Sequence, residues 1–537
     1  MNIKQLHSNV TIPIFIIFTL LIGATPAWAE DYYVNAINGN DQNPGTLSQP
    51  WETITKANST LKAGDTVFIR GGTYKGQQIY PKNNGTANNR ITYQNYNDEI
   101  VTISDTDTPL VLSNRSYITI TGSASQNIII TNCDKYLTMS NGSYNIFAYL
   151  TIGSMRNYDR FRGFNIGSNS RYNWVHHSTL YKYGEYTASN DRGDMVYIGD
   201  SSSGNNSHNL IEDNHFYSGG HNVFTVNTPY NIIRNNYMHN EVWQKGYGGR
   251  IAEIRKSVDN GSGIGSWNLI EGNRFAFTGI PPDNNYAPAV KIISHDNIVR
   301  KNMFYAAKGP ALQLVTFSKV NPNPYCDNNY MFHNAFFYNG VGQTGQRGYS
   351  ILFKHDTGKI EGNVIKNNIF HQNVVGNIYS LGGNTSINNW TDNESCFVDA
   401  QVDLVDSKDD DYPDFNLQDG GSCIDKGGFL TTTTSSGSGT SIPVNDSHYF
   451  FDGWDFPSYM NVNGDLIQLE GETATARVVN IDYDNNIITV DTPLTWISGQ
   501  GVTLEYYDLA PDPGPIESGV YHDSTLLPPS NLRIVQK

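Results

Sequence analysis

Six charged or titratable residues between positions 239 and 295 have the types that removal of a proton beside a carboxylate requires. Cleavage of a uronate polymer by β-elimination needs a cation that neutralises the sugar carboxylate, a base that removes the adjacent proton, and an acid that protonates the leaving oxygen. Arginine can bind a carboxylate in bidentate fashion, while lysine can serve as the base and histidine as the acid. The candidate catalytic residues are therefore Arg250, Arg255, Lys256, Lys291, His239 and His295.

The charge of this stretch differs from the charge of the whole chain. Residues 245–308 carry nine Lys or Arg and five Asp or Glu, whereas the chain of 537 residues has 35 basic and 51 acidic residues and a net charge of −16. A chain this acidic is not expected to bind nucleic acid or an anionic membrane through bulk charge. The local excess of positive charge predicts instead an acidic polysaccharide as the partner.

An eight-residue phrase occurs five times along the chain. It reads NLIEDNHF from Asn209, and NIIRNNYM, NLIEGNRF, NIVRKNMF and NVIKNNIF follow from residues 231, 268, 297 and 363. Repetition at this spacing is typical of solenoids, in which each repeat stacks on its neighbours. Each copy alternates apolar and polar residues, as a half-buried strand does. The sequence therefore predicts an all-β chain folded as a parallel β-helix.

The sixth residue of each phrase is Asn. This side chain tolerates the left-handed backbone conformation of a corner, and its amide can bond the backbone of a turn. Amides on successive rungs can also bond one another along the axis, as in other stacked ladders. We therefore interpret these residues as scaffold and not as catalytic groups. They are Asn214, Asn236, Asn273, Asn302 and Asn368, with Asn334 in a looser copy.

A second strand of each rung carries the polar residues of interest. Six segments can be stacked: MVYIGD from Met195, VFTVNT from Val223, IAEIRK from Ile251, AVKIIS from Ala289, ALQLVT from Ala311 and ILFKHD from Ile351. Their second and fourth positions are apolar, except for Lys354, and are expected in the core. The third positions, which face outward, are Tyr197, Thr225, Glu253, Lys291, Gln313 and Phe353. The fifth positions, also outward, are Gly199, Asn227, Arg255, Ile293, Val315 and His355.

A polymer lying across these rungs would contact further side chains. The segments GGHNVF and MHNEVWQKGYGGR place several of them in one long rung, whose loop could wall one side of a groove. A purely structural role stays open, because Glu253 and Lys291 could form an ion pair between rungs without function. Each His could likewise be a turn residue. The candidate substrate-binding residues are Tyr197, His221, Asn227, Glu241, Gln313 and His355.

The chain divides into six segments. Residues 1–29 combine one charge, Lys4, with an apolar run too short to span a bilayer and with the small residues AWA. This pattern predicts a signal peptide and a secreted or periplasmic protein without a membrane span, which we expect to be a monomer. The remaining segments are an N-terminal strand and amphipathic capping helix at 30–75, the β-helix at 76–395, its C-terminal closure at 396–429, a Ser/Thr/Gly linker at 430–440, and a small β module with a tail at 441–537.

The two ends of the repeat region resemble known proteins. DYYVNAINGNDQNPGT, followed by PWETITKANSTLKAGDTVFIRGGTYKG, is similar to the opening of many secreted right-handed β-helix proteins, including the chondroitinase B and alginate lyase family. The stretch FVDAQVDLVDSKDDDYPDFNLQDGGSCIDKGG resembles their closing segment. The resemblance implies a right-handed helix. It also implies Ca²⁺ held by Asn and Glu beside a lysine base, and in AEIRKS it would make Glu253 a metal ligand, Lys256 the base and Asn227 a ligand from the preceding rung.

Three function classes remain open. The main prediction is a polysaccharide lyase that cleaves a uronate polymer by β-elimination, with Ca²⁺ as its cofactor. A glycoside hydrolase on the same scaffold would need two carboxylates across the scissile bond, for which Glu253 could pair with Asp194 or Glu241. A non-catalytic polysaccharide-binding or surface protein is the third class. The acidic run at 406–414 could hold Ca²⁺ or be a solvated loop. The pairing of the four cysteines is open, although a disulfide between Cys396 and Cys423 could fasten the end of the repeat region.

Overall fold

The structure is a computed structural model of the chain. It describes residues 29–156, 162–183, 186–187, 190–191, 193–199, 206–240, 249–255, 265–278, 287–316, 326–355, 360–391, 396–400 and 413–519. The predicted signal peptide and the acidic run therefore lie almost wholly outside the described residues, as do the predicted site residues Glu241 and Lys256.

Three long parallel sheets make up most of the described chain. The thirteen-stranded sheet contains, in spatial order, β1 Asp31–Val34, β2 Thr66–Ile69, β4 Ile91–Asn95, β7 Ile118–Thr121, β10 Ile146–Ala148, β13 Trp174–His176, β18 Leu210–Glu212, β21 Ile232–Arg234, β24 Leu269–Glu271, β27 Ile298–Arg300, β30 Tyr330–Phe332, β33 Val364–Lys366 and β36 Thr385–Ile387. The eleven-stranded sheet contains β3 Gly72–Lys75, β5 Val101–Ser104, β8 Ile128–Thr131, β11 Leu150–Gly153, β14 Thr179–Tyr183, β19 His215–Gly219, β22 Tyr237–Asn240, β25 Arg274–Thr278, β28 Met303–Ala307, β31 Ala335–Phe337 and β34 Ile369–His371. The ten-stranded sheet contains β35 Gly376–Tyr379, β32 Tyr349–His355, β29 Leu312–Thr316, β26 Val290–Ile293, β23 Arg250–Arg255, β20 Asn222–Val226, β17 Asp194–Ile198, β12 Phe164–Ile166, β9 Leu137–Met139 and β6 Leu110–Val111.

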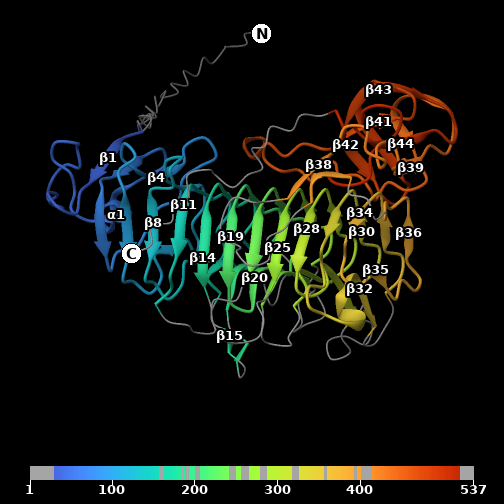
Figure 1. Cartoon of the computed structure of the whole chain (residues 1–537). Helices are drawn as coiled ribbons and strands as arrows, with labels where there is room; N and C mark the ends of the chain where they lie inside the picture. The colour runs from blue at the N-terminus through green and yellow to red at the C-terminus, as the bar shows by residue number, and fades with distance from the viewer. Residues whose placement is uncertain are drawn as a thin grey trace, which may run out of the picture.

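One rung shows how the chain coils. Strands β18, β19 and β20 belong to the thirteen-, eleven- and ten-stranded sheets in turn, and β21, β22 and β23 repeat the order. Each strand pairs in parallel with its counterpart on the next rung, so that the rungs stack along one axis (Figure 1). Side chains that point inward, such as Ile211, Phe216 and Phe224, form a continuous core. The predicted parallel β-helix is confirmed.

Two Asn ladders run along the corners of the helix. The predicted ladder continues from Asn214 to Asn389, and in each step the side-chain oxygen of one Asn accepts from the backbone and side-chain nitrogens of the Asn on the preceding rung, at 2.9–3.1 Å. The first Asn of the phrase forms a second ladder with the same pattern, which was not predicted from the sequence. Its members include Asn209, Asn231, Asn268, Asn297, Asn329 and Asn363.

The left-handed residue at each corner is the one before the ladder Asn. We expected the Asn itself to adopt this conformation, but the φ angles of 54°, 55° and 52° belong to Asp213, Asn235 and His333. Because the corner residue turns the backbone, the side chain of the ladder Asn that follows it points inward. There its amide bonds backbone N–H and C=O groups that have no described partner in the adjacent strands. The ladder Asn is thus a buried hydrogen-bonding group, and the preceding position tolerates many residue types.

We predict that Asn302→Ala destabilises the helix by about 2–3 kcal/mol, because buried amide partners that lose their bonds are costly. Asn302 is fully buried, and its amide joins Asn273, Asn334 and the Ile270 carbonyl. Urea unfolding followed by circular dichroism measures the change. Asn389→Ala, at the less buried end of the same ladder, is the matched control and should cost clearly less; equal losses would contradict the ladder argument.

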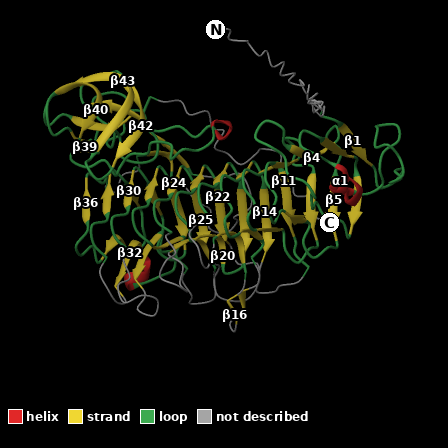
Figure 2. Ribbon diagram, turned by 180° about the vertical axis from the view of Figure 1, so that it is seen from behind, coloured by secondary structure: helices red, strands yellow, loops and turns green. Residues whose placement is uncertain are grey.

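A short helix lies at the N-terminal end of the β-helix. Helix α1 spans Ile54–Thr60, and the Thr53 side chain caps it by accepting from the Lys56 amide at 3.0 Å. Ile54 and Ala57 join the core beside the first strands, and Figure 2 shows the helix at that end of the molecule. The predicted capping helix is present and covers apolar surface that an open end would expose.

The segment that follows the last rung turns back along the eleven-stranded sheet. Strands β37 Phe397–Asp399 and β38 Asp414–Leu417 form an antiparallel pair. Phe397 and Phe415 pack on the outward residues Tyr305 and Phe337 of that sheet. Cys396 and Cys423 form a disulfide, and Cys133 and Cys326 are buried thiols. The outer side of the eleven-stranded sheet is therefore covered over its C-terminal part.

The C-terminal module is a six-stranded antiparallel sheet, and it contains the tract expected to be a linker. Its spatial order is β39 Thr431–Thr432, β44 Gly501–Leu504, β41 Leu466–Leu469, β42 Thr475–Asp482, β43 Ile487–Trp496 and β40 Gly437–Pro443. The Ser/Thr/Gly residues 430–440 are thus not a mobile linker, since they contribute β39 and the start of β40. Their small side chains suit the close pairing of β40 with β43.

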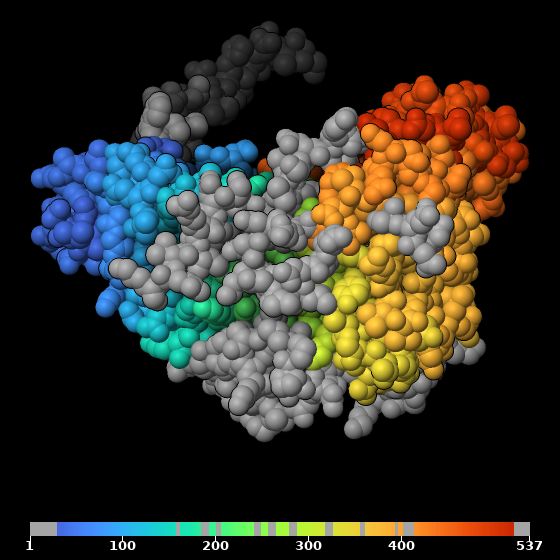
Figure 3. All heavy atoms as spheres, viewed as in Figure 1, coloured from blue at the N-terminus to red at the C-terminus, as the bar shows by residue number. Residues whose placement is uncertain are grey.

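The module packs on the outer face of the thirteen-stranded sheet. Leu210, Ile232, Leu269 and Ile298 project from successive strands and join one apolar cluster with module residues such as Phe450. Figure 3 shows most of the module against the C-terminal half of the helix. Tyr459 of the module reaches further toward the N-terminal rungs, where it contacts Tyr172 and its ring centre lies 5.5 Å from the guanidinium of Arg90. Two of the three outer faces are therefore occupied, at least in part, by later segments of the same chain.

The remaining elements are small. They are the strand pair β15 Tyr186–Thr187 and β16 Asn190–Asp191 and the 3₁₀ helices η1 Gly345–Gly348 and η2 Ser458–Met460. Within the residue ranges that the structure describes, no helix is long and apolar enough to cross a membrane.

Candidate functional site

The ten-stranded sheet carries the predicted column of polar side chains. Tyr197 on β17, Thr225 on β20, Glu253 on β23, Lys291 on β26 and Gln313 on β29 are neighbours in register. The flanking residues Val196 and Ile198, and their counterparts on the next strands, lie in the core. The register predicted for these five strands is confirmed. All five side chains are nevertheless almost inaccessible, with Glu253 only 3% and Lys291 only 6% exposed.

The sixth strand is paired one residue away from the predicted register. Leu352, not Phe353, is the partner of Gln313, and Lys354, not His355, is the partner of Val315. Phe353 therefore points into the core, where it is 1% exposed. The predicted alignment had forced Lys354 into an apolar position, and the one-residue shift removes this conflict because it exchanges the two faces of the strand. In the backbone register His355 is paired with Thr316 and not with Val315.

Glu253 is the centre of a compact charged cluster, in which three cationic side chains surround its carboxylate. Lys291 Nζ lies 3.5 Å from Oε1, and Arg250 and Arg255 lie 3.4 Å and 3.8 Å from Oε2. The two guanidinium groups are the more accessible part of the cluster, with about a quarter of each side chain exposed (25% and 23%). Positive charge therefore exceeds negative charge where the cluster meets solvent.

The environment shifts the pKa values of the two buried members in a way that suits proton transfer. Burial alone would raise the pKa of Glu253, but Arg250, Lys291 and Arg255 outweigh it and hold the pKa at about 2. Burial, and after it Arg250, lowers the pKa of Lys291 to about 8, although Glu253 opposes this shift. A lysine with a pKa near 8 has a substantial neutral fraction at mildly alkaline pH and can act as a base.

Asn222 links this cluster to a second carboxylate. Its amide nitrogen lies 3.0 Å from Asp194 Oδ1 and 3.3 Å from Glu253 Oε2, and it is fully buried. His221 lies 3.5 Å from Asp194 and 2.7 Å from Arg250 Nη1. Asp194, Asn222 and Arg250 are register neighbours at the starts of their strands. With Lys291 on β26, the cluster therefore spans four rungs.

Sequence reasoning missed Asn222 because period two fails at the start of these strands. Val223 and Phe224 both pack in the core, as do Ile251 and Ala252 on the next rung. Strict alternation would place Asn222 on the same side as Phe224, whereas the two consecutive core residues return it to the polar side. The stacked segments, extended by one residue toward the N-terminus of each strand, would have found it.

Tyr197 and Asn227 form the other edge of the cluster. The Asn227 amide donates to the Tyr197 hydroxyl at 2.7 Å, and the guanidinium of Arg162 lies 3.4 Å from the centre of the Tyr197 ring. Two buried polar atoms here, Asn227 Oδ1 and Arg255 Nε, have no hydrogen-bond partner among the residues that the structure describes. Buried polar atoms normally have partners, so these two atoms are available to a ligand.

Two of the predicted acids lie apart from the cluster. His239 belongs to the eleven-stranded sheet, where its Nε2 lies 2.8 Å from His215 Nε2 and its ring stacks on Tyr217. His295 lies in the turn after β26 and bonds Asp296 at 2.5 Å. Neither His is in contact with Glu253 or Lys291 through any described interaction. The structure therefore places both apart from the cluster, and His221 is the imidazole in contact with Arg250.

Calcium does not fit the described part of this cluster. A Ca²⁺ ion is held by six to eight oxygens, several of them from carboxylates, but the Glu253 carboxylate already faces three cationic side chains, which would repel a further cation. Along the ranges that the structure covers, no group of three or more His, Cys, Asp or Glu side chains could hold a metal ion. We therefore derive no step through calcium.

A family comparison agrees with the fold. Residues 32–218 match the model of the Pel9A-like, right handed beta helix region. The predicted resemblance to right-handed β-helix proteins is therefore confirmed. Over 110 residues the chain is also 36% identical to the uncharacterized protein YwoF of Bacillus subtilis (strain 168), an alignment that covers 19% of this chain and 23% of that protein.

Several solved structures are similar to this chain at low sequence identity. A GH136 lacto-N-biosidase from Eubacterium ramulus is 13% identical over 68% of each chain, with a TM-score of 0.47. A rhamnogalacturonan lyase is 14% identical over 73% of this chain and 95% of its own, with a TM-score of 0.44. The PL6 family alginate lyase AlyGC is 16% identical over 62% of this chain and 52% of its own, with a TM-score of 0.38. A fold does not determine a reaction, so the reaction has to be argued from the residues of this chain.

Proposed function

We propose that this protein is a secreted polysaccharide lyase that cleaves a uronate-containing polymer by β-elimination, with Lys291 as the base. One observation carries the proposal: Lys291 is buried beside two arginines, and its pKa is lowered to about 8. Buried lysines tuned toward neutrality are typical of proton-abstraction sites. The excess of positive charge around it suits an anionic substrate.

Arg250 and Arg255 would bind the sugar carboxylate and so acidify the adjacent proton. Their guanidinium groups reach solvent from either side of Glu253, and both forks match carboxylate geometry. Neutral Lys291 then takes the proton from carbon 5, the new double bond forms between carbons 4 and 5, and the bond from carbon 4 to the glycosidic oxygen breaks. His221, 2.7 Å from Arg250, would supply a proton to the leaving oxygen. Glu253 holds the three cations in place and does not react.

Hydrolysis by Asp194 and Glu253 is a weaker candidate. The two carboxylates of a glycosidase must flank the scissile bond, whereas here the amide of Asn222 lies between them and bonds both. The substrate would have to displace a fully buried side chain.

An absorbance assay tests the proposal. The mature chain, beginning near Glu30, is incubated with pectate, rhamnogalacturonan, alginate and chondroitin sulfate, with and without Ca²⁺. Elimination creates an unsaturated uronate that absorbs in the ultraviolet, whereas hydrolysis creates reducing ends without this absorbance. We expect absorbance with at least one polymer. New reducing ends alone would replace the lyase by a hydrolase, and neither signal would reduce the function to binding.

The pH dependence should follow the pKa of Lys291. The base must be neutral, so kcat/KM should rise about tenfold per pH unit below the pKa and level off above about 8. Glu253 raises the pKa of Lys291 through its negative charge. Glu253→Gln should therefore move the rising limb to lower pH, even if it also lowers the maximum. A rising limb that does not move in this variant would contradict the assignment of Lys291 as the base.

A further inference from the structure

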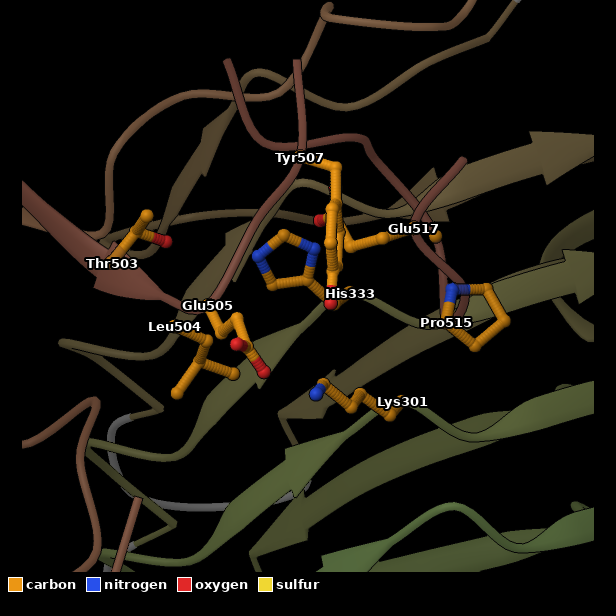
Figure 4. Close-up of a pocket in the computed structure, with 9 residues that line it drawn as sticks. Lys301, His333, Thr503, Leu504, Glu505, Tyr507, Pro515 and Glu517 are labelled. Atoms are coloured by element: carbon orange, nitrogen blue, oxygen red, sulfur yellow. The ribbon is translucent and has the colours of Figure 1, made fainter. Parts of the chain in front are cut away.

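A pocket lies on the opposite flank from the ten-stranded sheet, where the C-terminal module meets the corner between the other two sheets. It has a volume of about 130 Å³. Lys301 and His333 enter it from the turns before β28 and β31, one rung apart, while Thr503, Glu505 and Tyr507 enter from β44 and the chain just after it. Figure 4 shows these side chains around the pocket, with the charged ends of Lys301 and Glu505 directed toward one another.

The Thr503 hydroxyl is a buried polar group at the wall of the pocket that lacks a described hydrogen-bond partner. Thr503 is fully buried and lines the pocket, yet its oxygen has no hydrogen-bond partner among the residues described. A buried hydroxyl without a partner is costly. A ligand with its own hydroxyl groups would satisfy it.

The charges of the pocket nearly cancel near pH 7. Lys301 contributes one positive charge and Glu505 one negative charge to the lining of the pocket. Burial, with the charge of Asp512, raises the pKa of Glu517 to about 8, so this side chain is mostly protonated. Burial lowers the pKa of His333 to about 3, so the imidazole is neutral. The pocket therefore offers hydrogen-bond donors and acceptors, and its lining has no net charge that would favour an ionic ligand.

We propose that this pocket binds a single neutral pyranose unit, separate from the site on the ten-stranded sheet. Adjacent sugar hydroxyls can bond the Glu505 carboxylate, the Lys301 ammonium and the Thr503 hydroxyl. The Tyr507 ring, on a residue that is 44% exposed, offers an apolar face to the C–H side of a sugar. An acidic sugar is disfavoured because the one cation of the pocket is already balanced by Glu505.

The pocket is built before any ligand arrives. Gly514 lies on its wall, and its amide bonds the Asn367 carbonyl at 2.8 Å. The φ angle of Gly514 is +93°, and an added Cβ would lie 2.7 Å from the Ile369 side chain. Asp512 fixes the same segment by accepting from the amides of Asp425 and Ser518. A preformed pocket reduces the ordering cost of binding.

Saturation-transfer NMR and calorimetry with free sugars test the proposal. The full mature chain is titrated with D-galactose, D-glucose, L-rhamnose and, as the acidic arm, D-galacturonate. We expect millimolar binding of at least one neutral sugar, with galacturonate at least tenfold weaker. Thr503→Val should weaken binding about fivefold or more, because it removes the hydroxyl and keeps the shape. Tyr507→Ala should weaken binding about tenfold.

Two variants are matched controls. Thr179→Val removes another buried hydroxyl that has no described partner, and Tyr379→Ala removes a ring of similar exposure; both lie outside the pocket. Both should leave sugar binding unchanged. The proposal is overturned if no neutral sugar binds, if galacturonate binds best, or if the pocket variants, still folded by circular dichroism, bind as the parent does. These outcomes are independent of lyase activity, which depends on Lys291.

Discussion

Lys291→Ala should lower kcat on the best uronate polymer by about 10²–10⁴-fold, the usual contribution of a positioned general base. KM should change much less, because Arg250 and Arg255 remain to bind the carboxylate. Truncation also leaves Glu253 with one cation fewer at 3.5 Å. Initial rates of ultraviolet absorbance over a range of polymer concentrations separate the two parameters.

Three comparisons make this result specific. Lys291→Arg keeps the positive charge but supplies a group that is not deprotonated, so it should be as inactive as the alanine variant. Lys75→Ala removes an exposed lysine on β3 and should retain full activity. Lys256→Ala tests the base that the family resemblance implies. If Lys256→Ala loses activity while Lys291→Ala keeps it, Lys291 is not the base.

The fold was predictable because the repeats encode it locally. Each phrase contains a strand, a corner and the start of the next strand, so that five copies sufficed to predict stacked parallel strands. Because the sixth residue of every phrase is Asn, the sequence also indicated that this position has the same structural role in each rung. It did not show which backbone position turns the corner, because a left-handed conformation is adopted there by residues as different as Asp213, Lys301 and His333.

The candidate site was predictable only where alternation between core and surface is strict. Glu253 and Lys291 were placed side by side because both neighbours of each are apolar, and the structure pairs them. The register of β32 was wrong by one residue, because the preceding segments vary in length and no repeated phrase anchors this strand. Asn222 was missed because the two residues after it, Val223 and Phe224, both enter the core. His239 was grouped with Arg250 because the two are close in sequence, but His239 lies on the eleven-stranded sheet and Arg250 on the ten-stranded sheet.

The docking of the C-terminal module could not be predicted from the repeats. The outer face of the thirteen-stranded sheet combines apolar residues with Glu212, Arg234, Glu271 and Arg300, a pattern equally typical of an exposed face. The partner of Arg300 is Asp465, 165 residues further along the chain. Only the folded structure shows that Glu212 and Arg300 in this row are buried and that a later segment supplies the partner of Arg300.

Asp465→Ala should destabilise the packing of the module on the helix by about 3–5 kcal/mol, the cost of leaving a buried charge without its partner. Arg300 is 2% exposed and donates to both oxygens of Asp465, at 2.7 Å and 2.6 Å. Asp465 also accepts from the Phe451 amide at 2.9 Å. After the substitution, Glu271, at 3.0 Å, is the carboxylate left beside the guanidinium. Urea unfolding, followed by tryptophan fluorescence and by limited proteolysis, measures the loss.

The double variant Arg300→Met with Asp465→Leu distinguishes an unpaired charge from a lost contact. Apolar residues of similar size often replace a buried ion pair at little cost, so the double variant should be more stable than Asp465→Ala alone. Glu472→Ala, an exposed carboxylate in the same module, should change stability by less than about 0.5 kcal/mol. If the double variant loses as much stability as the single one, the module is held by side-chain packing and by the hydrogen bond from the Phe451 amide, and not by the ion pair. If Asp465→Ala costs nothing, the apolar contacts of Leu210, Ile232 and their neighbours hold the module without it.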